Sequence, residues 1–597
     1  MALDLTPEQK DIGRKNFAQA AGDLARLKPT DPTRRTFMGS MVAGAAVVPL
    51  SSAMYFGYDS WKGNKAVRTA FIGVGDEGGV LIGEHNPEFT EIVAIADIRP
   101  YNLDRAFKGE AQGPRKGLNK IYGEASAKKI KQYGNWEELL APGVIAELGL
   151  EAVVIALPLH LHHDATVKCM AAGLHVLCEK LMARTIGQCK SMTKAAQEYG
   201  RVFNVGHQRH YSMLYAHATE VVQSGVLGDI KHIRALWHRN NSWPFTADDK
   251  VRATFAAGKD VDGVEFDMPF YKDGWYKPVL KTDVEALGGD PARLKKYGYD
   301  SLRELVRWRV YDRTGGGLMA ELGSHQLDAS SIFLGKVHPL AVQGVGGKFF
   351  YGPGRNDRQG DDGVFVTYEF PGKNHPLGAG RGSDPTDIVV VTYSSFNTNS
   401  FEEYGECLMG SKGTMVVERE ADVYLFREKG GTSAPSDAGG KATEIKVTAD
   451  KAGKPVTEAS STWGGAGGGA VTKSAGAGAW DTNVRGYRTE MEHFAFCVRA
   501  WGKDKADYTK GADGKLKHAD KLPRCHGEVA MADAILAHGA NMAMANRTRI
   551  EFDPKWFDTN SPDVPETKFG KPGGGTCDGA RSSGIGGTPG GDVPVYA

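Results

Sequence analysis

A glycine-rich turn at residues 73–78 constrains the fold of this chain more than any other feature. The turn has the sequence Gly-Val-Gly-Asp-Glu-Gly and follows directly on a short apolar run, residues 66–72. A second apolar run, residues 92–96, ends at Asp97. A strand, a Gly-x-Gly-x-x-Gly turn that opens a helix, and an acidic residue about twenty positions later form the dinucleotide-binding fingerprint. The sequence therefore predicts a Rossmann domain.

Each glycine of the turn has a separate physical task. Gly73 permits the tight turn, Gly75 lets the backbone approach a pyrophosphate, and Gly78 lets the helix pack closely on the strand. The free N–H groups and the positive dipole end of that helix then face the phosphates. Because Asp76 and Glu77 place two negative charges in this loop, we expect both side chains to point away from the phosphates.

The residue type at position 97 bears on the choice of cofactor. A carboxylate at Asp97 can accept hydrogen bonds from both ribose hydroxyls and would repel a 2′-phosphate, which favours NAD. Arg99, two residues further on, keeps NADP as an alternative.

Apolar strands alternate with helices in the rest of the N-terminal part. Residues 152–156 and 175–178 are apolar runs, and a helical stretch at about 164–172 lies between them. This alternation is typical of a doubly wound parallel sheet. We expect the Rossmann domain to cover residues 66–210.

The pattern changes beyond residue 210. Residues 230–239 and 363–370 alternate between apolar and polar side chains, as in an antiparallel sheet that is exposed on one face. We therefore expect an α/β domain with a large open, mostly antiparallel sheet over residues 211–570. Three segments stand out from it: an aromatic-studded insertion at about 244–307, a Gly-rich excursion at about 430–478, and a tail at 571–597 that we expect to be disordered.

Residues 1–65 have the form of an export signal with a linker. The pair Arg34-Arg35 precedes an uncharged segment from Thr36 to Tyr58, and residues 51–53 form a small-residue cleavage site. The segment is also long enough to remain as a membrane anchor. We expect export to the periplasm in the folded state by the twin-arginine route, and leave cleavage and anchoring open.

Composition excludes several classes of partner. Lysine and arginine (73) balance aspartate and glutamate (72), so neither nucleic acid nor an anionic membrane surface is expected as a partner. No pair of the seven cysteines has CxxC or CxxH spacing. We therefore expect scattered buried thiols, without a zinc site, a disulfide framework or any other metal centre.

Three further motifs resemble those of one enzyme family. The turn Ala156-Leu157-Pro158 with His162, the strand end Glu179-Lys180-Leu181, and the run from Gly315 to Asp328 with Glu321 and His325 are similar to motifs of the glucose–fructose oxidoreductase/inositol dehydrogenase (Gfo/Idh/MocA) family. The resemblance covers most of residues 66–560. It implies an NAD(P)-dependent oxidoreductase acting on CH–OH groups of sugars.

The resemblance and the fingerprint together assign the cofactor contacts. They are Gly73, Val74, Gly75, Asp76, Glu77, Gly78, Asp97, Ile98, Arg99, Ala156, Leu157, Pro158, His162, Glu179, Lys180 and Gln208. Two positions depart from the family pattern. Leu181 replaces a proline that could hold a cis peptide beside Lys180, and Glu321 replaces an aspartate. We expect either change to alter the aim of its group while cofactor binding is kept.

The catalytic prediction also follows from residue spacing. Glu321, His325 and Asp328 are spaced i, i+4 and i+7, which places them on one face of a helix. A histidine held there by carboxylates would titrate near neutral pH and move a proton on or off a hydroxyl. Lys180, at the carboxyl end of a parallel strand, would steady an alkoxide. We predict Lys180 and His325 as the proton-handling pair and Glu321 as their support.

Substrate contacts are assigned from residue chemistry. Aromatic faces with amide or guanidinium donors suit a polyol. The candidates are Arg209, His238, Asn240, Trp308, Arg309 and Asp328. On the strand at 230–239, Trp237 and Arg239 share one face, while His238 and Asn240 share the other. Only one of these pairs can line the cleft, and the sequence leaves the choice open.

The predicted function is hydride transfer between a nicotinamide cofactor and a sugar, glycoside or polyol. Outside the cytoplasm there is no pool of free NAD, so we expect the cofactor to be tightly bound and recycled. One alternative is an NAD-dependent glycosidase or lyase that uses transient oxidation. Another is a non-catalytic binding or scaffold protein that kept the fold. We also expect a homo-oligomer formed through the C-terminal sheet.

Overall fold

The N-terminal sheet has six parallel strands in the order β3-β2-β1-β4-β5-β6. The structure is a computed structural model that describes residues 5–27, 55–58, 61, 63–240, 273–277, 279–351, 358–428, 445–449, 455–459 and 485–571. The strands are β1 Val67–Ile72, β2 Thr90–Ala96, β3 Lys131–Tyr133, β4 Ala152–Ile155, β5 His175–Glu179 and β6 Phe203–Gly206. This order is that of the Rossmann fold, so the predicted parallel sheet is confirmed.

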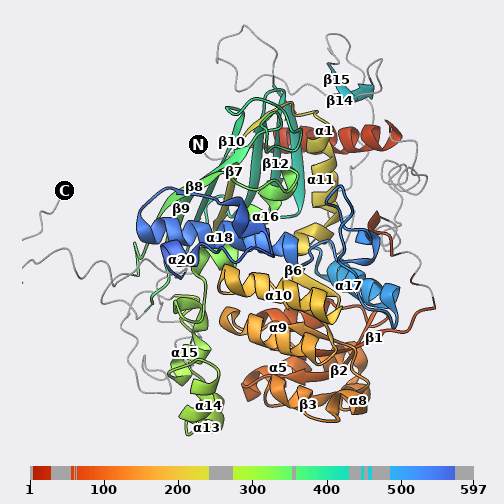
Figure 1. The fold of residues 1–597 in the computed structure, drawn as a ribbon, viewed down its shortest axis with the longest axis vertical. Helices are drawn as coiled ribbons and strands as arrows, with labels where there is room; N and C mark the ends of the chain where they lie inside the picture. The colour runs from red at the N-terminus through yellow and green to blue at the C-terminus, as the bar shows by residue number, and fades with distance from the viewer. Residues whose placement is uncertain are drawn as a thin grey trace, which may run out of the picture.

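Helices cover both faces of this sheet (Figure 1). Those from the N-terminal part are α4 Asp76–Glu84, α5 Pro100–Lys108, α6 Leu118–Tyr122, α7 Glu124–Ala127, α8 Val144–Leu148, α9 His162–Ala171 and α10 Ile186–Tyr199. One helix comes from far along the chain: α17 (Tyr487–Trp501) buries Phe494 and Val498 in the same apolar cluster as Phe71 and Ile95. The Rossmann layer is therefore completed by residues beyond the predicted boundary at 210.

The C-terminal sheet has eight strands in the order β13-β12-β11-β7-β10-β9-β8-β16. Only β7 and β10 pair in parallel; the other neighbours are antiparallel. The predicted large, mostly antiparallel sheet is thus confirmed. The strands are β7 Ile230–His238, β8 Ala341–Gly347, β9 Gly363–Pro371, β10 Ile388–Phe396, β11 Tyr404–Gly410, β12 Gly413–Glu418, β13 Asp422–Arg427 and β16 Ile550–Glu551.

The two faces of the C-terminal sheet differ. Helices α11 (Met213–Gln223), α16 (Ser324–Phe333) and α18 (Gly527–Asn546) pack on one face and form the core with it. On the strands, buried and accessible residues alternate, as in β10. Large apolar side chains remain exposed on β8 to β11, among them Val345 (64% exposed), Phe365 (46%) and Met409 (40%). Helices α19 (Pro554–Phe557) and α20 (Glu566–Phe569) follow α18.

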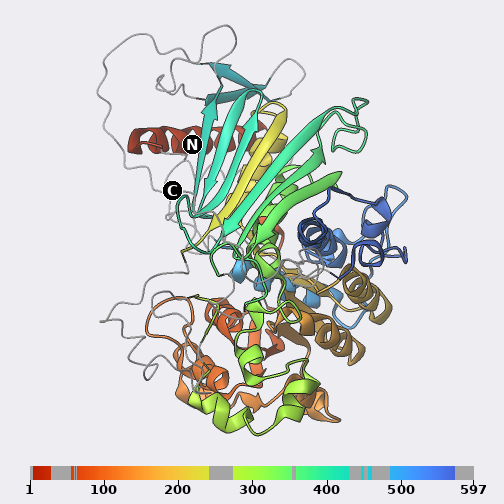
Figure 2. The same ribbon diagram turned by 90° about the vertical axis from the view of Figure 1, so that its left-hand side faces the viewer.

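Part of the predicted insertion forms helices on the Rossmann domain. Figures 1 and 2 show α13 (Lys281–Leu287), α14 (Pro291–Lys296) and α15 (Leu302–Val306) beside that domain, away from the C-terminal sheet. Side chains fix where two of them begin: Asp290 accepts a hydrogen bond from the Arg293 amide, and Ser301 accepts one from the Glu304 amide. We call residues 273–277 and 279–313 the strap.

An N-terminal helix, α1 (Pro7–Leu27), packs against edge strand β13 (Figure 1). Asn16 donates a hydrogen bond of 3.0 Å to the Leu425 carbonyl of that strand, and Phe17 is buried. Arg14 pairs with Asp422 at 2.8 Å. The helix therefore covers backbone groups that an edge strand would leave unpaired. Residues 7–27 of the predicted signal-and-linker segment are thus a packed part of the fold.

Several predictions lie partly outside the described residues. The pair Arg34-Arg35 and the cleavage site at 51–53 are among these, as is the tail from residue 572. Of the Gly-rich excursion, the structure describes a hairpin of β14 (Ile445–Ala449) and β15 (Pro455–Ala459). Among the described helices, none is both long and apolar enough to cross a membrane. The six described cysteines are buried and free, as predicted.

Candidate active site

A cleft of about 1070 Å³ lies at the carboxyl ends of the Rossmann strands. Its walls come from the glycine turn, the strap and the C-terminal domain. Open α/β sheets bind ligands at this edge. The cleft is therefore the place to test the predicted site residues.

The glycine turn has the geometry that a dinucleotide requires. Gly73 has φ +81°, and a Cβ there would lie 2.5 Å from the Ala156 carbonyl oxygen. A Cβ on Gly78 would lie 2.1 Å from the Gly73 oxygen, so both positions require glycine. At Gly75 the nearest atom would be 3.6 Å away, and no side chain caps the N-terminus of α4. The turn therefore offers bare backbone and free N–H groups to phosphates.

Asp97 is held in place at the end of β2. Its carboxylate accepts hydrogen bonds from the backbone amides of Val74 (2.9 Å) and Arg99 (2.8 Å) and from the Asn102 side chain. Burial raises the pKa of Asp97, although these donors oppose the shift. Carboxylate oxygens accept about four hydrogen bonds in total, so Asp97 keeps capacity for a ribose hydroxyl. The residues present fit a dinucleotide.

The two acidic residues of the turn are accommodated in different ways. Asp76 pairs with Arg105 (3.1 Å) and Lys277, and Arg309 lies 3.9 Å away. Burial would raise the pKa of Asp76, but Lys277 and Arg309 outweigh it and lower that pKa far below its usual range. Glu77 is enclosed near Lys180, and burial raises its pKa. Asp76 therefore lines the cleft with its charge compensated, instead of simply pointing away.

Lys180 joins the two domains at the cleft. It follows the end of β5, and its Nζ donates a hydrogen bond of 2.7 Å to the main-chain oxygen of Glu321. The Lys180–Leu181 peptide bond is cis, although residue 181 is not a proline. His162 contacts the carbonyl oxygens of Leu181 (2.9 Å) and Leu157 (2.7 Å) through its two ring nitrogens. It therefore ties the β4 turn to the segment that carries Lys180.

Glu321 lies in an irregular turn. Residues Met319–Gly323 form a π-helix directly before α16, so the regular i, i+4, i+7 spacing is broken there. The Glu321 carboxylate pairs with Arg309 at 2.9 Å. Burial would raise its pKa, but Arg309 and Lys180 outweigh burial and lower it. Glu321 and His325 both line the cleft, whereas Asp328 does not.

His325 is a neutral imidazole in this site. It is 7% exposed, its ring packs on Trp237 with centroids 5.3 Å apart, and its Nδ1 has no hydrogen-bond partner among the described residues. Burial lowers its pKa well below the usual value, and the positive charges of Lys180 and Arg209 lower it further. The expectation that His325 titrates near neutral pH is therefore wrong, because the nearest charges are cations.

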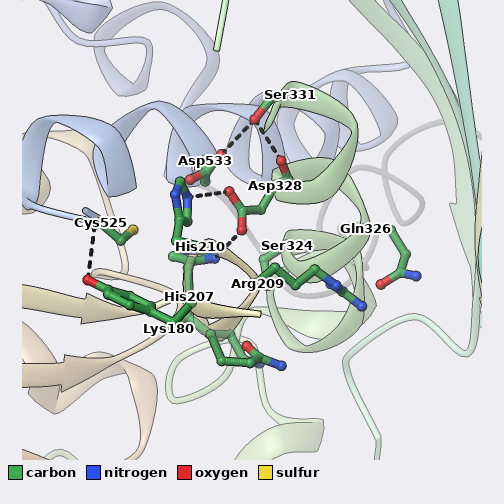
Figure 3. A network of polar contacts seen from close by, with 12 residues as sticks. Lys180, His207, Arg209, His210, Ser324, Gln326, Asp328, Ser331, Cys525 and Asp533 are labelled. Atoms are coloured by element: carbon green, nitrogen blue, oxygen red, sulfur yellow. Dashed lines mark hydrogen bonds and ion pairs between the residues drawn. The ribbon is translucent and has the colours of Figure 1, made fainter. Parts of the chain in front are cut away.

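Asp328 belongs to a buried network behind the cleft (Figure 3). His210 Nε2 lies 2.9 Å from its carboxylate, and Lys336 bonds to both Asp328 (3.1 Å) and Asp533 (2.8 Å). Two overlapping groups here, His210/Cys525/Asp533 and His207/Asp328/Asp533, have potential metal ligands close together. The Lys336 ammonium already compensates the two carboxylates, so the cluster is an internal ion network. Asp328 is therefore placed away from substrate.

Both pairs of candidate side chains at the end of β7 reach the cleft. Trp237 packs on His325, and the Arg239 guanidinium lies over the Trp237 ring at 4.9 Å. His238 instead contacts the Phe401 carbonyl and the Ser394 hydroxyl, each at 2.8 Å. Trp237 and Arg239 thus lie beside His325, but His238 and Asn240 also line the cleft, so the expectation that only one pair can line it is wrong.

Of the remaining candidates, some line the cleft and one lies behind it. Trp308 and Arg309 line the cleft. Arg209 is buried behind it and pairs with Glu420. Gln208, assigned to the cofactor, lines the cleft and is within 3.5 Å of the Tyr487 hydroxyl.

Sequence reasoning missed several residues of the cleft. They are mostly cationic or aromatic and include Tyr101, Arg105, Arg115, Lys277, Tyr299, Tyr404, Arg485 and Tyr487. Those from the strap lie in a segment without a helical or strand period, so only its aromatic content pointed to them. Arg485 and Tyr487 lie beyond the Gly-rich excursion, and nothing in the sequence there indicates that these residues lie in the same cleft as the glycine turn.

Two family models match the chain. The model of the Gfo/Idh/MocA oxidoreductase family with an NAD-binding Rossmann fold matches residues 67–207. The model of that family's C-terminal α/β domain matches residues 290–441.

The individual relatives have low sequence identity to this chain. A glycosyl hydrolase family 109 protein from Stenotrophomonas maltophilia is 28% identical over 253 residues, 42% of this chain and 50% of that protein. A 2,7-anhydro-N-acetylneuraminate hydratase from Escherichia coli is 23% identical over 295 residues, 48% of this chain and 62% of that protein. The matches thus span about half to three fifths of these two relatives. The WlbA dehydrogenase from Bordetella pertussis, solved with NADH and UDP-GlcNAcA, has a TM-score of 0.48 at 15% identity, over 82% of this chain and 98% of that one.

Proposed function

Since the chain belongs to the Gfo/Idh/MocA oxidoreductase family and has an NAD-binding Rossmann domain, we propose that it transfers a hydride between a retained nicotinamide dinucleotide and a sugar, glycoside or polyol. The observation that carries the proposal is the meeting of Lys180 and His325 in one cleft with the glycine turn. The first is a cation and the second a neutral base, which together suit the oxidation of a hydroxyl group.

The chain's own residues have distinct tasks in this reaction. The turn from Gly73 to Gly78 and Asp97 would hold the dinucleotide, which when bound accepts or donates the hydride. The Lys180 ammonium has three donors, of which one bonds to Glu321, so others can reach a substrate hydroxyl. That charge stabilises an alkoxide as it forms. The neutral imidazole of His325 can take up the hydroxyl proton.

The walls of the cleft favour a polyhydroxylated substrate. Arg239 lies over the ring of Trp237 and Arg309 over that of Trp308, so each guanidinium is held in place and offers fixed donors to hydroxyls at an aromatic wall of the cleft. Glu321 orients Arg309 through the 2.9 Å ion pair. A sugar or polyol matches this mixture better than an apolar ligand does.

Contacts between the strap and the Rossmann domain support a retained cofactor. Lys277 pairs with Asp76, Lys296 pairs with Glu137, and Arg293 donates a hydrogen bond of 2.9 Å to the Gly134 carbonyl. These contacts cross the cleft edge where the dinucleotide would enter. Leaving would require several of them to open together, which slows release.

A single-turnover assay tests the proposal. The purified protein is mixed with a panel of sugars, glycosides and polyols, and the nicotinamide absorbance is followed. At least one compound should reduce the bound dinucleotide. If the protein carries a dinucleotide but no compound changes the absorbance and no glycoside is cleaved, a binding or scaffold role replaces the oxidoreductase proposal.

A second candidate function is cleavage of a glycoside, by hydrolysis or by elimination, through transient oxidation. The printed names of two relatives, a glycosyl hydrolase and a hydratase, favour it. The structure adds an acid suited to such a reaction: Glu179 lines the cleft, and burial together with the charge of Glu77 raises its pKa to about 8. It therefore holds a proton at neutral pH that a leaving group could accept. Release of a chromogenic aglycone without net change in nicotinamide absorbance would favour this candidate.

Assembly and export are further parts of the proposal. The exposed apolar side chains on β8 to β11 support a homo-oligomer formed through the open face of the C-terminal sheet. Export in the folded state rests on Arg34-Arg35 and the uncharged segment after it. An Arg34→Lys/Arg35→Lys double variant should stay in the cytoplasm on cell fractionation; normal export of that variant would mean another route.

A further inference from the structure

A buried ion pair links the strap to the cofactor side of the Rossmann domain. The Arg99 guanidinium makes two parallel hydrogen bonds to Asp283, from Nε to Oδ1 at 3.1 Å and from Nη2 to Oδ2 at 2.6 Å. The Asp283 side chain is fully buried, and that of Arg99 is 14% exposed. The two residues come from α13 and from the turn before α5, and these two helices pack together. The pair is thus a fixed part of the cleft wall.

Asp283 thereby pairs with the cation that a 2′-phosphate would need, which is Arg99. The amide of Arg99 bonds to the Asp97 carboxylate at 2.8 Å, and the Arg99 side chain feels the charge of Asp97. An arginine in this position is the usual partner of a 2′-phosphate on the adenosine ribose. Here two of the five donors of its guanidinium, on Nε and Nη2, bond to Asp283, whose charge balances that of Arg99. Drawing Arg99 to a phosphate would leave a buried carboxylate without its partner, which is strongly unfavourable.

Other cations near the ribose position are also engaged with carboxylates. Arg105 pairs with Asp76 at 3.1 Å, and Arg115 pairs with Glu110 at 3.1 Å. Lys277 pairs with Asp76 as well. Each of these three cations in the described part of the wall therefore already has a carboxylate partner.

A neutral group of the strap faces the same place. Tyr299 is 1% exposed and lines the cleft, and its hydroxyl has no hydrogen-bond partner among the described residues. It lies close enough to Asp97 for that charge to act on it. A buried phenol without a partner is costly, and a ribose hydroxyl would satisfy it. A phenol and a carboxylate suit a ribose diol, and the carboxylate repels a phosphate dianion.

We infer that Asp283 of the strap is a specificity-determining residue: by holding Arg99 it makes the site select NAD over NADP, and Tyr299 completes the ribose contact. The inference rests on the proposed function, because it requires a bound nicotinamide dinucleotide. It assigns to the strap a chemical task beyond retention, since Asp283 adds to Asp97 a second acidic group that favours NAD and comes from outside the Rossmann domain.

The test reads which dinucleotide the protein carries. Purified protein is incubated with an equimolar excess of NAD and NADP until exchange with the bound dinucleotide is complete, free ligand is removed, and the ligand released by denaturation is identified by mass spectrometry. The parent should carry NAD in excess by roughly tenfold or more, the value of one lost charge-assisted hydrogen bond. Asp283→Asn frees Arg99 and should shift the ratio toward NADP by roughly tenfold. Adding Arg99→Gln to Asp283→Asn should abolish that gain.

Two controls keep the outcomes separate. Asp290→Asn removes a negative charge from the same strap and keeps the hydrogen bond to the Arg293 amide, so it should leave the ratio unchanged. If Asp283→Asn does not fold, Arg99→Gln alone decides: it can still bond to Asp283 and should keep the NAD preference of the parent.

Four results would overturn the inference or its basis. Equal NAD and NADP in the parent, or a tenfold loss of NADP in Arg99→Gln, would show that Arg99 is available to the 2′-phosphate. An unchanged ratio in folded Asp283→Asn would remove Asp283 from cofactor selection. Absence of any dinucleotide from the parent would instead contradict the proposed function itself.

Discussion

The Lys180 ammonium donates a hydrogen bond of 2.7 Å to the main-chain oxygen of Glu321, across the boundary between the Rossmann domain and the C-terminal domain. The Glu321 side chain in turn pairs with Arg309, which lies 3.9 Å from Asp76 of the glycine turn. One continuous chain of contacts thus connects the proposed acid–base group with the proposed phosphate site.

Lys180→Met should keep the fold and the bound dinucleotide but lose turnover by roughly two to four decades, as expected for a positioned acid–base group. Methionine keeps much of the aliphatic stem while it deletes the charge. Single-turnover reduction of the bound cofactor measures the effect. Lys194→Met, on the exposed side of α10, is the matched control and should behave like the parent. A Lys180→Met variant that reduces the cofactor at the parental rate would exclude Lys180 from the chemistry.

His325→Asn should lower the single-turnover rate without changing the shape of its pH profile between pH 6 and 8. The reason is that burial, with Lys180 and Arg209, lowers the pKa of His325 well below this window, so the imidazole is neutral throughout it. The measurement is the rate in parent and variant at several pH values. A parental rate that falls between pH 8 and 6, with the fall absent in the variant, would show that His325 titrates there after all.

Most of the fold was predictable because its strands carry strong local signals. Buried parallel strands are short continuous apolar runs, so residues 67–72, 152–155 and 175–179 stood out from the sequence. The parallel pairing of β7 with β10 inside a mostly antiparallel sheet did not, because pairing depends on partners more than a hundred residues apart. The docking of α1 on β13 was hidden for the same reason.

The site was predictable only where a motif fixes geometry. The glycine turn and Lys180 lie where the motifs indicated. The helical-face argument failed for Asp328, because His210 and Lys336, which lie outside α16, hold its carboxylate in the buried network behind the cleft. The pKa of His325 depends on cations contributed by other elements, and Arg99 meets Asp283 across 184 residues of sequence. Neither the pKa of His325 nor the Arg99–Asp283 pair is indicated by the sequence around these residues.

Glu406→Gln should change how stability depends on pH. Burial raises the pKa of Glu406 to about 7, whereas in the unfolded chain it is about 4.3. Between these values the folded protein keeps a proton that the unfolded chain has lost, so this group costs stability as pH rises from about 4.3 to 7. Glutamine does not titrate, and Tyr215 and Gln326 can still bond to it.

The variant should therefore gain stability relative to the parent as pH rises from 4 to 8, by roughly 3 kcal/mol. Urea unfolding at several pH values measures this difference. Glu198→Gln, on the exposed part of α10, should show no such trend. A constant difference between the Glu406→Gln variant and the parent would mean that Glu406 is ionised in the folded protein.

Phe365→Glu should dissociate the proposed oligomer into monomers. Phe365 is 46% exposed on β9, and a charge there would have to be buried in an interface formed by the open face of the sheet. Light scattering after size-exclusion chromatography gives the mass in solution. Leu377→Glu introduces the same charge at an exposed loop position outside the sheet and should leave the mass unchanged. A monomeric parent protein would refute assembly through this face.

If the proposed export takes place, the exported protein should still contain α1. Cleavage after residue 53 would remove the Asn16–Leu425 hydrogen bond, the Arg14–Asp422 pair and the buried Phe17, and would uncover the edge of β13. Intact-mass measurement of protein recovered from the periplasm or the membrane decides the question. A mature form that begins near residue 54, with no N-terminal fragment bound, would show that α1 is dispensable in the working protein.

The most direct test of the central claim follows the hydride itself. An accepted sugar that carries deuterium on the carbon to be oxidised is incubated with the purified protein, the protein is denatured, and the released dinucleotide is weighed by mass spectrometry. Our account predicts a reduced dinucleotide that contains the deuterium in the parent and its near absence in Lys180→Met. The contrary result is a dinucleotide that stays unlabelled with every deuterated substrate that changes the nicotinamide absorbance. That result would contradict hydride transfer at this site.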